Sequence, residues 1–297
     1  MAFLEKKPRK WGDRRDGLWI RDLPGLNAVI AFLWPRRTEC EAYLQQTIDV
    51  TELLRFIEKK NAEHPEYKTT LFHCVVTAIF RMLNERPKMN RFVQGGRTYE
   101  RDEITAGFVA KRKFTDHSEE SLMLLTAQAE DTIDTVSKKI IGDVKEARER
   151  KETAGIDNIL DILGAFPRPF LWAFIRFIRT LDYWGKVPRA LTDGDMNYAS
   201  VSITNLGSIK CPSVYHHLGN YGTTSVFVSI GTIHKEQLVM EDGSLQIRDV
   251  VDLGVTVDER IADGFYFARS WKLVKHICAH PELLDKPLCE ESGYEYQ

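Results

Sequence analysis

An apolar segment at residues 70–87, TLFHCVVTAIFRMLNERP, constrains the fold more than any other feature of the sequence. Its apolar side chains surround most of a helical axis, so a helix formed here must be buried on nearly all sides. Pro87 ends this helix, because proline lacks the amide hydrogen and clashes with the preceding turn. His73 lies inside it, and we interpret this residue as a satisfied histidine of the core or of a subunit interface. The chain has 297 residues, 43% of them hydrophobic, which is enough for a core of the size that such a helix requires.

The other periodic segments alternate between helix and strand. Asp49 or Thr51 can cap a helix that precedes the buried one, a further helix is predicted at 130–151, and a last helix follows Asp263-Gly264 and ends at Pro281. Strands are predicted at 104–114, 121–128, 199–204, 223–231, 236–240 and 244–257, with a hairpin turn at Asp242-Gly243. Because helices and strands are interleaved, we expect one α/β domain.

Charge and cysteine content exclude several classes of protein. The sequence has 41 Lys and Arg against 43 Asp and Glu, whereas a dedicated nucleic-acid binder carries a clear basic excess. Five scattered cysteines without a CxxC pair argue against a zinc cluster or a disulfide framework and favour a reducing compartment. The N-terminus has no apolar signal region, and no run approaches the roughly 18 apolar residues of a membrane span. We therefore expect a cytoplasmic protein that uses no metal and binds no nucleic acid.

Two segments differ in character from the rest. Residues 1–24 are basic and polar, and we interpret them as a solvated arm that drapes over a neighbour, or alternatively as a phosphate or anion contact. The segment 166–191 is mostly apolar and aromatic, with Arg176 and Arg179 on a narrow polar edge, and it is too short to span a bilayer. Three interpretations stay open for it: a helix in an oligomer interface, a lid over a substrate channel, or a helix lying flat on a membrane surface.

Four motifs follow one another over roughly residues 34–285. They are WPRRTECEAY (34–43), IDVTELLRFIEKKN with the buried helix and RMLNERPKMNRF after it, SITNLGS (202–208), and VTVDERIADGFYFARSWKLVKHICAHPELL near the end. Together they resemble the acyltransferase (E2) catalytic domain of 2-oxo acid dehydrogenase complexes and chloramphenicol acetyltransferase, which share a fold. The resemblance implies a chloramphenicol acetyltransferase-like mixed sheet flanked by helices, as a single α/β domain with an aromatic helical insertion.

The resemblance also implies a reaction and its residues. Family members transfer an acyl group between coenzyme A and a thiol or hydroxyl, which requires a base for the acceptor and a donor for the tetrahedral oxyanion. Glu259 stands where the family has its catalytic histidine, and Thr204 matches the oxyanion donor. Asp263 matches the aspartate of the same motif. In the family this aspartate pairs with an arginine, and the resemblance implies Arg36 for that role here. Further positions are expected to shape the site: Asn205, Gly207, Arg260 and Gly264.

The glutamate departs from the family pattern and has two interpretations. Histidine has a pKa near ~6.5, whereas a free glutamate, with a pKa near ~4.3, is a weak base toward a thiol. Burial and the neighbouring Asp258 and Asp263 would raise the pKa of Glu259 toward neutrality, and Arg260 would oppose them. Glu259 is then the base. Otherwise it is a structural carboxylate that pairs with an arginine or accepts backbone N–H groups.

Under the second interpretation, the candidate alternative base is His216 or His217, in SVYHHLGNYGTTS. Adjacent residues of a strand point to opposite faces, so at most one of these histidines would reach a channel. The pair could equally line a subunit contact.

The expected organisation follows from the same comparison. We divide the chain into a basic arm (1–24), an acyltransferase-like domain (25–285) with an insertion at about 155–195, and a tail (286–297). Lipoyl and peripheral-subunit-binding segments are not recognised, so we expect a stand-alone member rather than a complete swinging-arm E2. The family implies a homotrimer with active sites at subunit boundaries, which some relatives assemble into a larger cage.

Two functions are carried forward. The first is a coenzyme A-dependent acyltransferase, with coenzyme A or acyl-coenzyme A as substrate. The alternative is a catalytically inactive oligomeric scaffold or binding protein on the same fold. Such a protein would contact a partner or a membrane surface through 166–191.

Overall fold

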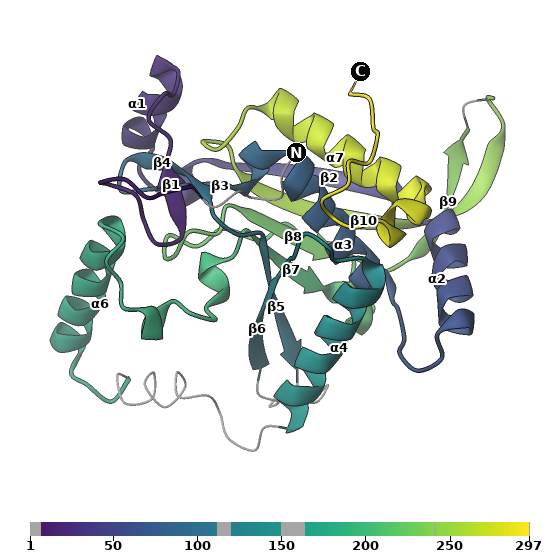
Figure 1. The fold of residues 1–297 in the computed structure, drawn as a ribbon, viewed down its shortest axis with the longest axis horizontal. Helices are drawn as coiled ribbons and strands as arrows, with labels where there is room; N and C mark the ends of the chain where they lie inside the picture. The colour runs from purple at the N-terminus through teal and green to yellow at the C-terminus, as the bar shows by residue number, and fades with distance from the viewer. Residues whose placement is uncertain (1–6, 112–119, 150–163, 241, 297) are drawn as a thin grey trace.

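The structure, a computed structural model, describes residues 7–111, 120–149, 164–240 and 242–296. In this part of the chain seven strands form one mixed sheet in the order β2-β10-β8-β7-β5-β6, with β9 paired to β10. Helices pack against this sheet, and a second, three-stranded sheet, β1-β4-β3, lies beside it (Figure 1). The predicted fold class, an α/β arrangement with helices flanking a mixed sheet, is confirmed.

The strands are β1 (Gly17–Trp19), β2 (Glu41–Asp49), β3 (Arg91–Gln94), β4 (Arg97–Arg101), β5 (Thr105–Lys111), β6 (Glu120–Thr126), β7 (Val201–Asn205), β8 (Val226–Ile230), β9 (His234–Val239) and β10 (Leu245–Asp258). The helices are α1 (Gly25–Leu33), α2 (Thr51–Glu63), α3 (Leu71–Glu85), α4 (Ile133–Glu149), α6 (Arg168–Tyr183) and α7 (Gly264–Ala279). All the predicted strands and helices that fall on described residues are present, with shifted ends. The predictions for 112–114 and for 150–163 lie outside the described residues.

The long strand β10 organises the sheet. It pairs antiparallel with β2, β8 and β9, whereas β5, β7 and β8 run parallel to one another. A parallel connection needs a long crossover, and the chain between β5 and β7 supplies one that contains α4 and α6. As a result, the two motifs that carry the predicted site, SITNLGS and DERIADG, lie at opposite ends of the central strands.

Helix α3 occupies the centre of the core, as the sequence predicted. Every residue from His73 to Leu83 is buried, and the helix packs against α4 and α7. His73 is buried as expected, but it is not satisfied, because among the described residues its Nδ1 has no hydrogen-bond partner. The interpretation as a satisfied core histidine is therefore wrong within one protomer, and the interpretation as a subunit-interface histidine stays a prediction.

The two faces of the large sheet differ. Alternate residues of β7, β8 and β10, such as Ile203, Val228 and Val255, join the hydrophobic core beneath the helices. The opposite side, which we call the polar face, carries the intervening residues: Tyr43, Ser202, Thr204, Phe227, Ser229 and Thr256. An irregular segment, residues 211–222, crosses the polar face, where the Ser229 hydroxyl hydrogen-bonds with the backbone of Val214.

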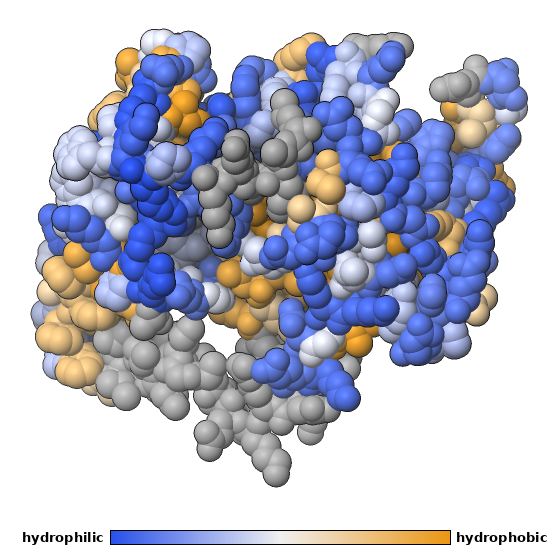
Figure 2. All heavy atoms as spheres, viewed as in Figure 1, coloured by the Kyte–Doolittle hydropathy of each residue, from blue (hydrophilic) through white to orange (hydrophobic). Residues whose placement is uncertain are grey.

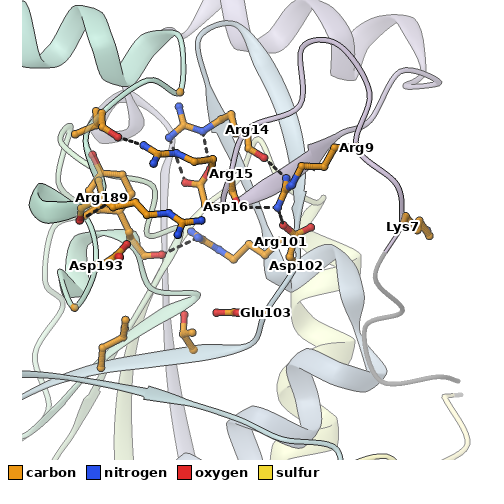
Figure 3. Close-up of a pocket in the computed structure, with 17 residues that line it drawn as sticks. Lys7, Arg9, Arg14, Arg15, Asp16, Arg101, Asp102, Glu103, Arg189 and Asp193 are labelled. Carbon is orange, nitrogen blue, oxygen red and sulfur yellow. Dashed lines mark hydrogen bonds and ion pairs between the residues drawn. The ribbon is translucent and has the colours of Figure 1, made fainter.

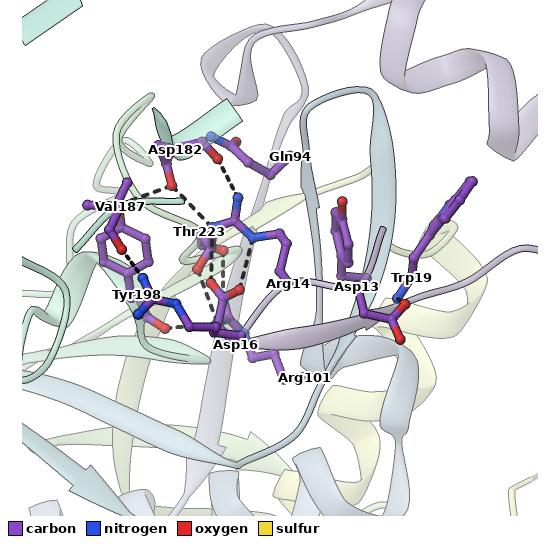
Figure 4. A network of polar contacts seen from close by, with 12 residues as sticks. Asp13, Arg14, Asp16, Trp19, Gln94, Arg101, Asp182, Val187, Tyr198 and Thr223 are labelled. Atoms are coloured by element: carbon purple, nitrogen blue, oxygen red, sulfur yellow. Dashed lines mark hydrogen bonds and ion pairs between the residues drawn. The ribbon is translucent and has the colours of Figure 1, made fainter. Parts of the chain in front are cut away.

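The N-terminal residues are less solvated than predicted. Arg14 is buried, and its guanidinium pairs with Asp16 at 2.9 Å and with Asp182 of α6 at 3.1 Å. Asp182 also accepts hydrogen bonds from Gln94 and Tyr198, so the network in Figure 4 joins the arm, the small sheet and the insertion. The prediction of a solvated arm is wrong for Arg14, because the buried Asp182 and the half-buried Asp16 hold it inside the protein.

The aromatic segment 166–191 forms α6, which stands at one side of the molecule (Figure 1). Its buried positions are few, Ile178 and Asp182, and most of its aromatic side chains are exposed. Helix α1 was not predicted, and it also exposes apolar side chains. Within the described residues, no helix is long and apolar enough to cross a membrane.

Residues 286–290 are tied to the core. Arg81 of α3 is fully buried and donates hydrogen bonds to the carbonyl oxygens of Lys286, Pro287 and Glu290. The amide of Leu288 donates to the carbonyl of Asp131, at the start of α4. Because a buried guanidinium without acceptors is costly, this segment is part of the stable fold.

Candidate active site

The loop that follows β10, residues 258–264, is fixed by a buried ion pair. Asp258 is fully buried and accepts two hydrogen bonds from the Arg260 guanidinium, at 2.8 and 2.7 Å, and a third from the Arg260 amide at 3.2 Å. The Nη1 of Arg260 also reaches the carbonyl of Trp34 at 2.9 Å, and the amide of Glu259 donates to the carbonyl of Cys40 at 2.9 Å. These bonds hold the backbone of Glu259 while its side chain is exposed to solvent. The burial that would turn Glu259 into a better base is therefore not supplied within one protomer.

Asp263 and Arg36 do not meet in the way the resemblance implied. The carboxylate of Asp263 accepts a hydrogen bond from the Tyr266 amide at 2.8 Å and caps α7, which begins at Gly264. Arg36 has a side chain that is 73% exposed, and it contacts Glu39 at 3.8 Å. The neighbouring Arg37 is the buried arginine of this segment.

Arg37, rather than Arg36, is the arginine of this segment that contacts the loop, and it does so at Asp258 rather than at Asp263. Its Nε lies 3.6 Å from Asp258, and its other nitrogens donate to the carbonyls of Gly219 and Gly222. The brace of the loop is thus Arg260 and Arg37 on Asp258. Sequence reasoning missed it because Arg36 and Arg37 are adjacent, and only the path of the chain decides which one points inward.

Thr204 lies at the other end of the sheet. It is half-buried near the end of β7 on the polar face, directly opposite Ser229 of β8. Asn205 ends the strand, and the turn after it needs Gly207, because a Cβ there would come within 2.5 Å of the Gly231 carbonyl oxygen. The hydroxyl of Thr204 is therefore held on a rigid strand end.

Thr204 and Glu259 are too far apart to act together in one protomer. Ser229 pairs with both Thr204 and Gly254, and Asp258 follows Gly254 by four residues on β10. Strands rise about 3.3 Å per residue and lie about 4.8 Å apart, so the backbones of Thr204 and Asp258 are about 16 Å apart. A site that uses both Thr204 and Glu259 must take one from each of two copies of the chain.

The two histidines of the 211–222 segment lie on the same side of the sheet as Thr204. His216 stacks on Phe227 with ring centroids 4.3 Å apart, and the His217 ring centroid lies 4.6 Å from that of His216. The segment is irregular rather than a strand, so the expectation of opposite-facing rings is not met. Phe227 pairs with Ser202, which places His216 nearer to Thr204 than Glu259 is within one protomer.

A cavity of about 500 Å³ opens where the N-terminal arm meets the segment that follows α6 (Figure 3). We call it the arm cavity. Six basic and four acidic side chains line it, and the pairs Arg9–Asp102 and Arg14–Asp16 offset each other. Basic side chains remain in excess, but four carboxylates share the lining, which makes the arm cavity a poor candidate for selective binding of an anion. In the described ranges, no group of three or more His, Cys, Asp or Glu residues could hold a metal ion.

Comparison with known proteins agrees with this architecture. Residues 188–285 match the family model of the 2-oxoacid dehydrogenases acyltransferase (catalytic domain). The chain is 24% identical over 241 residues to the lipoamide acyltransferase component of the branched-chain alpha-keto acid dehydrogenase complex of Bacillus subtilis (strain 168). That match covers 80% of this chain and 46% of the relative, so the chain spans about half the length of the curated relative it matches.

Solved structures with the same fold include a probable dihydrolipoamide acetyltransferase from Listeria monocytogenes 4b F2365. Its TM-score is 0.59 at 16% identity, with 94% of this chain and 98% of that chain covered. The cubic core of a pyruvate dehydrogenase multienzyme complex has a TM-score of 0.60 at 14% identity, with 90% and 94% covered. The resemblance predicted from the sequence is thereby confirmed: the chain has the fold of the E2 acyltransferase catalytic domain.

Proposed function

We propose that this protein is a coenzyme A-dependent acyltransferase that moves an acyl group between coenzyme A and a thiol or hydroxyl acceptor. The observation that carries the proposal is the family match over residues 188–285, the part of the chain that holds both Thr204 and Glu259. The fold places each of these residues at a fixed strand end, Thr204 on β7 and Glu259 just beyond β10. Free coenzyme A and acyl-coenzyme A are the substrates in this scheme.

Each residue has one role in the proposed reaction. The acceptor attacks the thioester carbonyl while Glu259 takes its proton, and the oxygen of the tetrahedral intermediate accepts a hydrogen bond from Thr204. The intermediate then collapses, the bond between carbon and the coenzyme A sulfur breaks, and Glu259 returns the proton to that sulfur. Asp258, Arg260 and Arg37 position the loop and touch no substrate.

The assembly is part of the proposal. Because Thr204 and Glu259 are about 16 Å apart along one sheet, the active site is formed between two copies, as in a homotrimer with boundary sites. Contact with a second copy would also cover Glu259 and supply the burial that a carboxylate base needs. Trimers of this kind could assemble further into a cage.

Mixed assemblies test both parts of the proposal. Thr204→Ala and Glu259→Gln should each abolish transfer from acetyl-coenzyme A to a thiol, while Glu63→Gln, an exposed control, should not. If the two inactive variants are unfolded and refolded together, random mixing restores about a quarter of the boundary sites, because each boundary needs one intact residue from each side. Full inactivity of the mixture would contradict a shared site. Calorimetric titration with coenzyme A that shows no binding would refute the acyltransferase itself.

A catalytically inactive scaffold or binding protein on the same fold is the second candidate. The observation in its favour is that the position of the family's histidine carries a glutamate whose side chain is exposed in the protomer. Apolar side chains gathered over α6, at the lower left of Figure 2, offer a surface for a protein partner or a membrane. Light scattering would give the assembly state, and flotation with lipid vesicles of Trp172→Ser and wild-type protein would separate protein contact from membrane contact.

A further inference from the structure

A second cavity, which we call the α6 cavity, lies between α1, the β3–β4 turn and the C-terminal end of α6. Its volume is about 500 Å³, and it adjoins the 258–264 loop through Arg260. Two glycines of the turn close one side of it. A Cβ on Gly95 would lie 2.4 Å from the Tyr183 carbonyl oxygen, and one on Gly96 would lie 2.7 Å from the Phe32 ring. The turn, α1 and α6 are therefore in direct contact around the cavity.

The charge of the α6 cavity is strongly one-sided. Four arginines line it, Arg36, Arg37, Arg179 and Arg260, against a single carboxylate, Asp182. That carboxylate is already engaged, because it binds Arg14, Gln94 and Tyr198 in the network of Figure 4. Asp258 offsets Arg260 and Arg37 from behind the lining, so the excess of positive charge in the α6 cavity rests on Arg179 and Arg36.

Two of the arginines have donors to spare. Among the described residues, the guanidinium of Arg179 forms no hydrogen bond or ion pair, and Arg36 has only its 3.8 Å contact with Glu39. Arg37 is 3% exposed, and its Nε has no hydrogen-bond acceptor, although an Asp258 oxygen lies 3.6 Å away. The Nε atoms of several other buried arginines also lack acceptors, so the spare donors that matter for a ligand are those of Arg179 and Arg36.

The rest of the lining is apolar or aromatic. Phe32, Pro35 and Tyr183 form this part of the wall, and Phe32 and Tyr183 remain largely exposed. Aromatic and apolar surface beside convergent guanidinium groups suits a ligand that has an anionic end and a flat or apolar part. Arginine is the side chain best suited to phosphate, because its planar fork can donate two hydrogen bonds to one phosphate group.

We propose that the α6 cavity binds an organic phosphate, with its phosphate group at Arg179 and Arg36 and its apolar part against Phe32 and Tyr183. This inference is independent of acyl transfer, because Arg179, Arg36, Phe32 and Tyr183, which would touch the ligand, have no role in the proposed reaction; Arg37 and Arg260 only border the cavity from the 258–264 loop. It gives α6 a task that its sequence alone does not reveal, namely to supply a phosphate-binding arginine to a cavity beside the 258–264 loop.

Phenyl phosphate is a suitable probe, because it combines one phosphate with one aromatic ring. Calorimetric titration of the full-length protein should show one site per chain for phenyl phosphate and weaker binding of inorganic phosphate. Arg179→Gln should weaken phenyl phosphate binding roughly tenfold or more, as expected for the loss of hydrogen bonds to a charged group. Arg36→Gln should weaken it in the same direction.

Arg176→Gln is the matched control. Arg176 lies one turn earlier on α6, is exposed, stacks over Trp172 and does not line the α6 cavity. Unchanged binding in this control, together with the loss in Arg179→Gln, would support the site. Absence of phenyl phosphate binding at millimolar concentration, or equal losses in the two variants, would overturn it. A parallel titration with coenzyme A keeps the two proposals separate. If coenzyme A does not bind, only the proposed acyltransferase activity is refuted. If coenzyme A competes with phenyl phosphate, coenzyme A is the source of the phosphate group that binds in the α6 cavity.

Discussion

His73 gives the sharpest test of the core, because its imidazole is buried and the Nδ1 atom has no hydrogen-bond partner in the described part of the chain. Its imidazole is 6% exposed, lies edge-on to Phe72, and has no acceptor or donor at Nδ1 among the described residues. Burial lowers the pKa of His73 from 6.5 to about 4, since no nearby group stabilises the imidazolium. The folded protein therefore keeps this ring neutral at pH values where the unfolded chain protonates it.

The sign of the stability change follows directly. Between the two pKa values the unfolded state binds more protons than the folded state, so the free energy of unfolding falls as the pH falls. At pH 5 the unfolded histidine is almost fully protonated and the folded one is not, which costs about 2 kcal/mol relative to pH 7.5. The full loss, reached below the folded pKa, is about 3 kcal/mol.

Replacement of His73 by leucine removes the titration while it keeps an apolar group of similar size in the core. Urea unfolding of both proteins at pH 7.5 and pH 5.0, at one protein concentration, gives the two free-energy differences. Wild-type protein should lose about 2 kcal/mol more than His73→Leu between these pH values. Equal losses would show that His73 is protonated or satisfied in the folded protein and would refute the reasoning.

Three further substitutions test the site at the level of stability, each by thermal or urea unfolding. Asp258→Asn should destabilise by roughly 3–5 kcal/mol, because it leaves Arg260 buried without its charge partner; a loss below about 1 kcal/mol would mean that water reaches the pair. Gly207→Ala should cost roughly 1–3 kcal/mol, since its Cβ meets the Gly231 carbonyl, and an unchanged unfolding midpoint would show that the turn relaxes freely. Asp263→Ala should cost about 1 kcal/mol through the lost cap of α7, and Asp263→Ser should recover most of it; failure of that recovery would assign Asp263 a role other than capping.

The fold was largely predictable because its strongest patterns are local. The apolar run of α3, the Asp-Gly turn before β10 and the capping aspartate of α7 each dictate a structure through nearby residues alone. Helix α1 was missed because its apolar residues are mostly exposed, so its sequence lacks the one-sided pattern that marks a buried helix. The small sheet was missed because its strands are only three to five residues long.

The candidate site was less predictable because it depends on long-range contacts. Motif resemblance located Thr204 and the 258–264 loop, but it assigned the brace to Arg36, whereas Arg37 is the residue that enters the protein. It also gave no indication that Asp182 would bind Arg14, since 168 residues separate them along the chain. Contacts of this kind are set by how whole elements pack, which a periodicity in one segment does not encode.

The hydrogen bonds from Arg81 to residues 286–290 have a consequence for folding during synthesis. Helix α3 is synthesised early, yet the carbonyl groups that accept hydrogen bonds from its fully buried guanidinium belong to residues 286–290, which are added after almost all of the hydrophobic core. Strand β10, which pairs with three other strands, is also late. In a ribosome-bound chain that stops before residue 286, Arg81 either stays in water or is buried without these acceptors, which is energetically unfavourable. We therefore expect the core around α3 to form only after residues 286–290 have left the ribosome. Until then the apolar surface of α3 must be kept from aggregation.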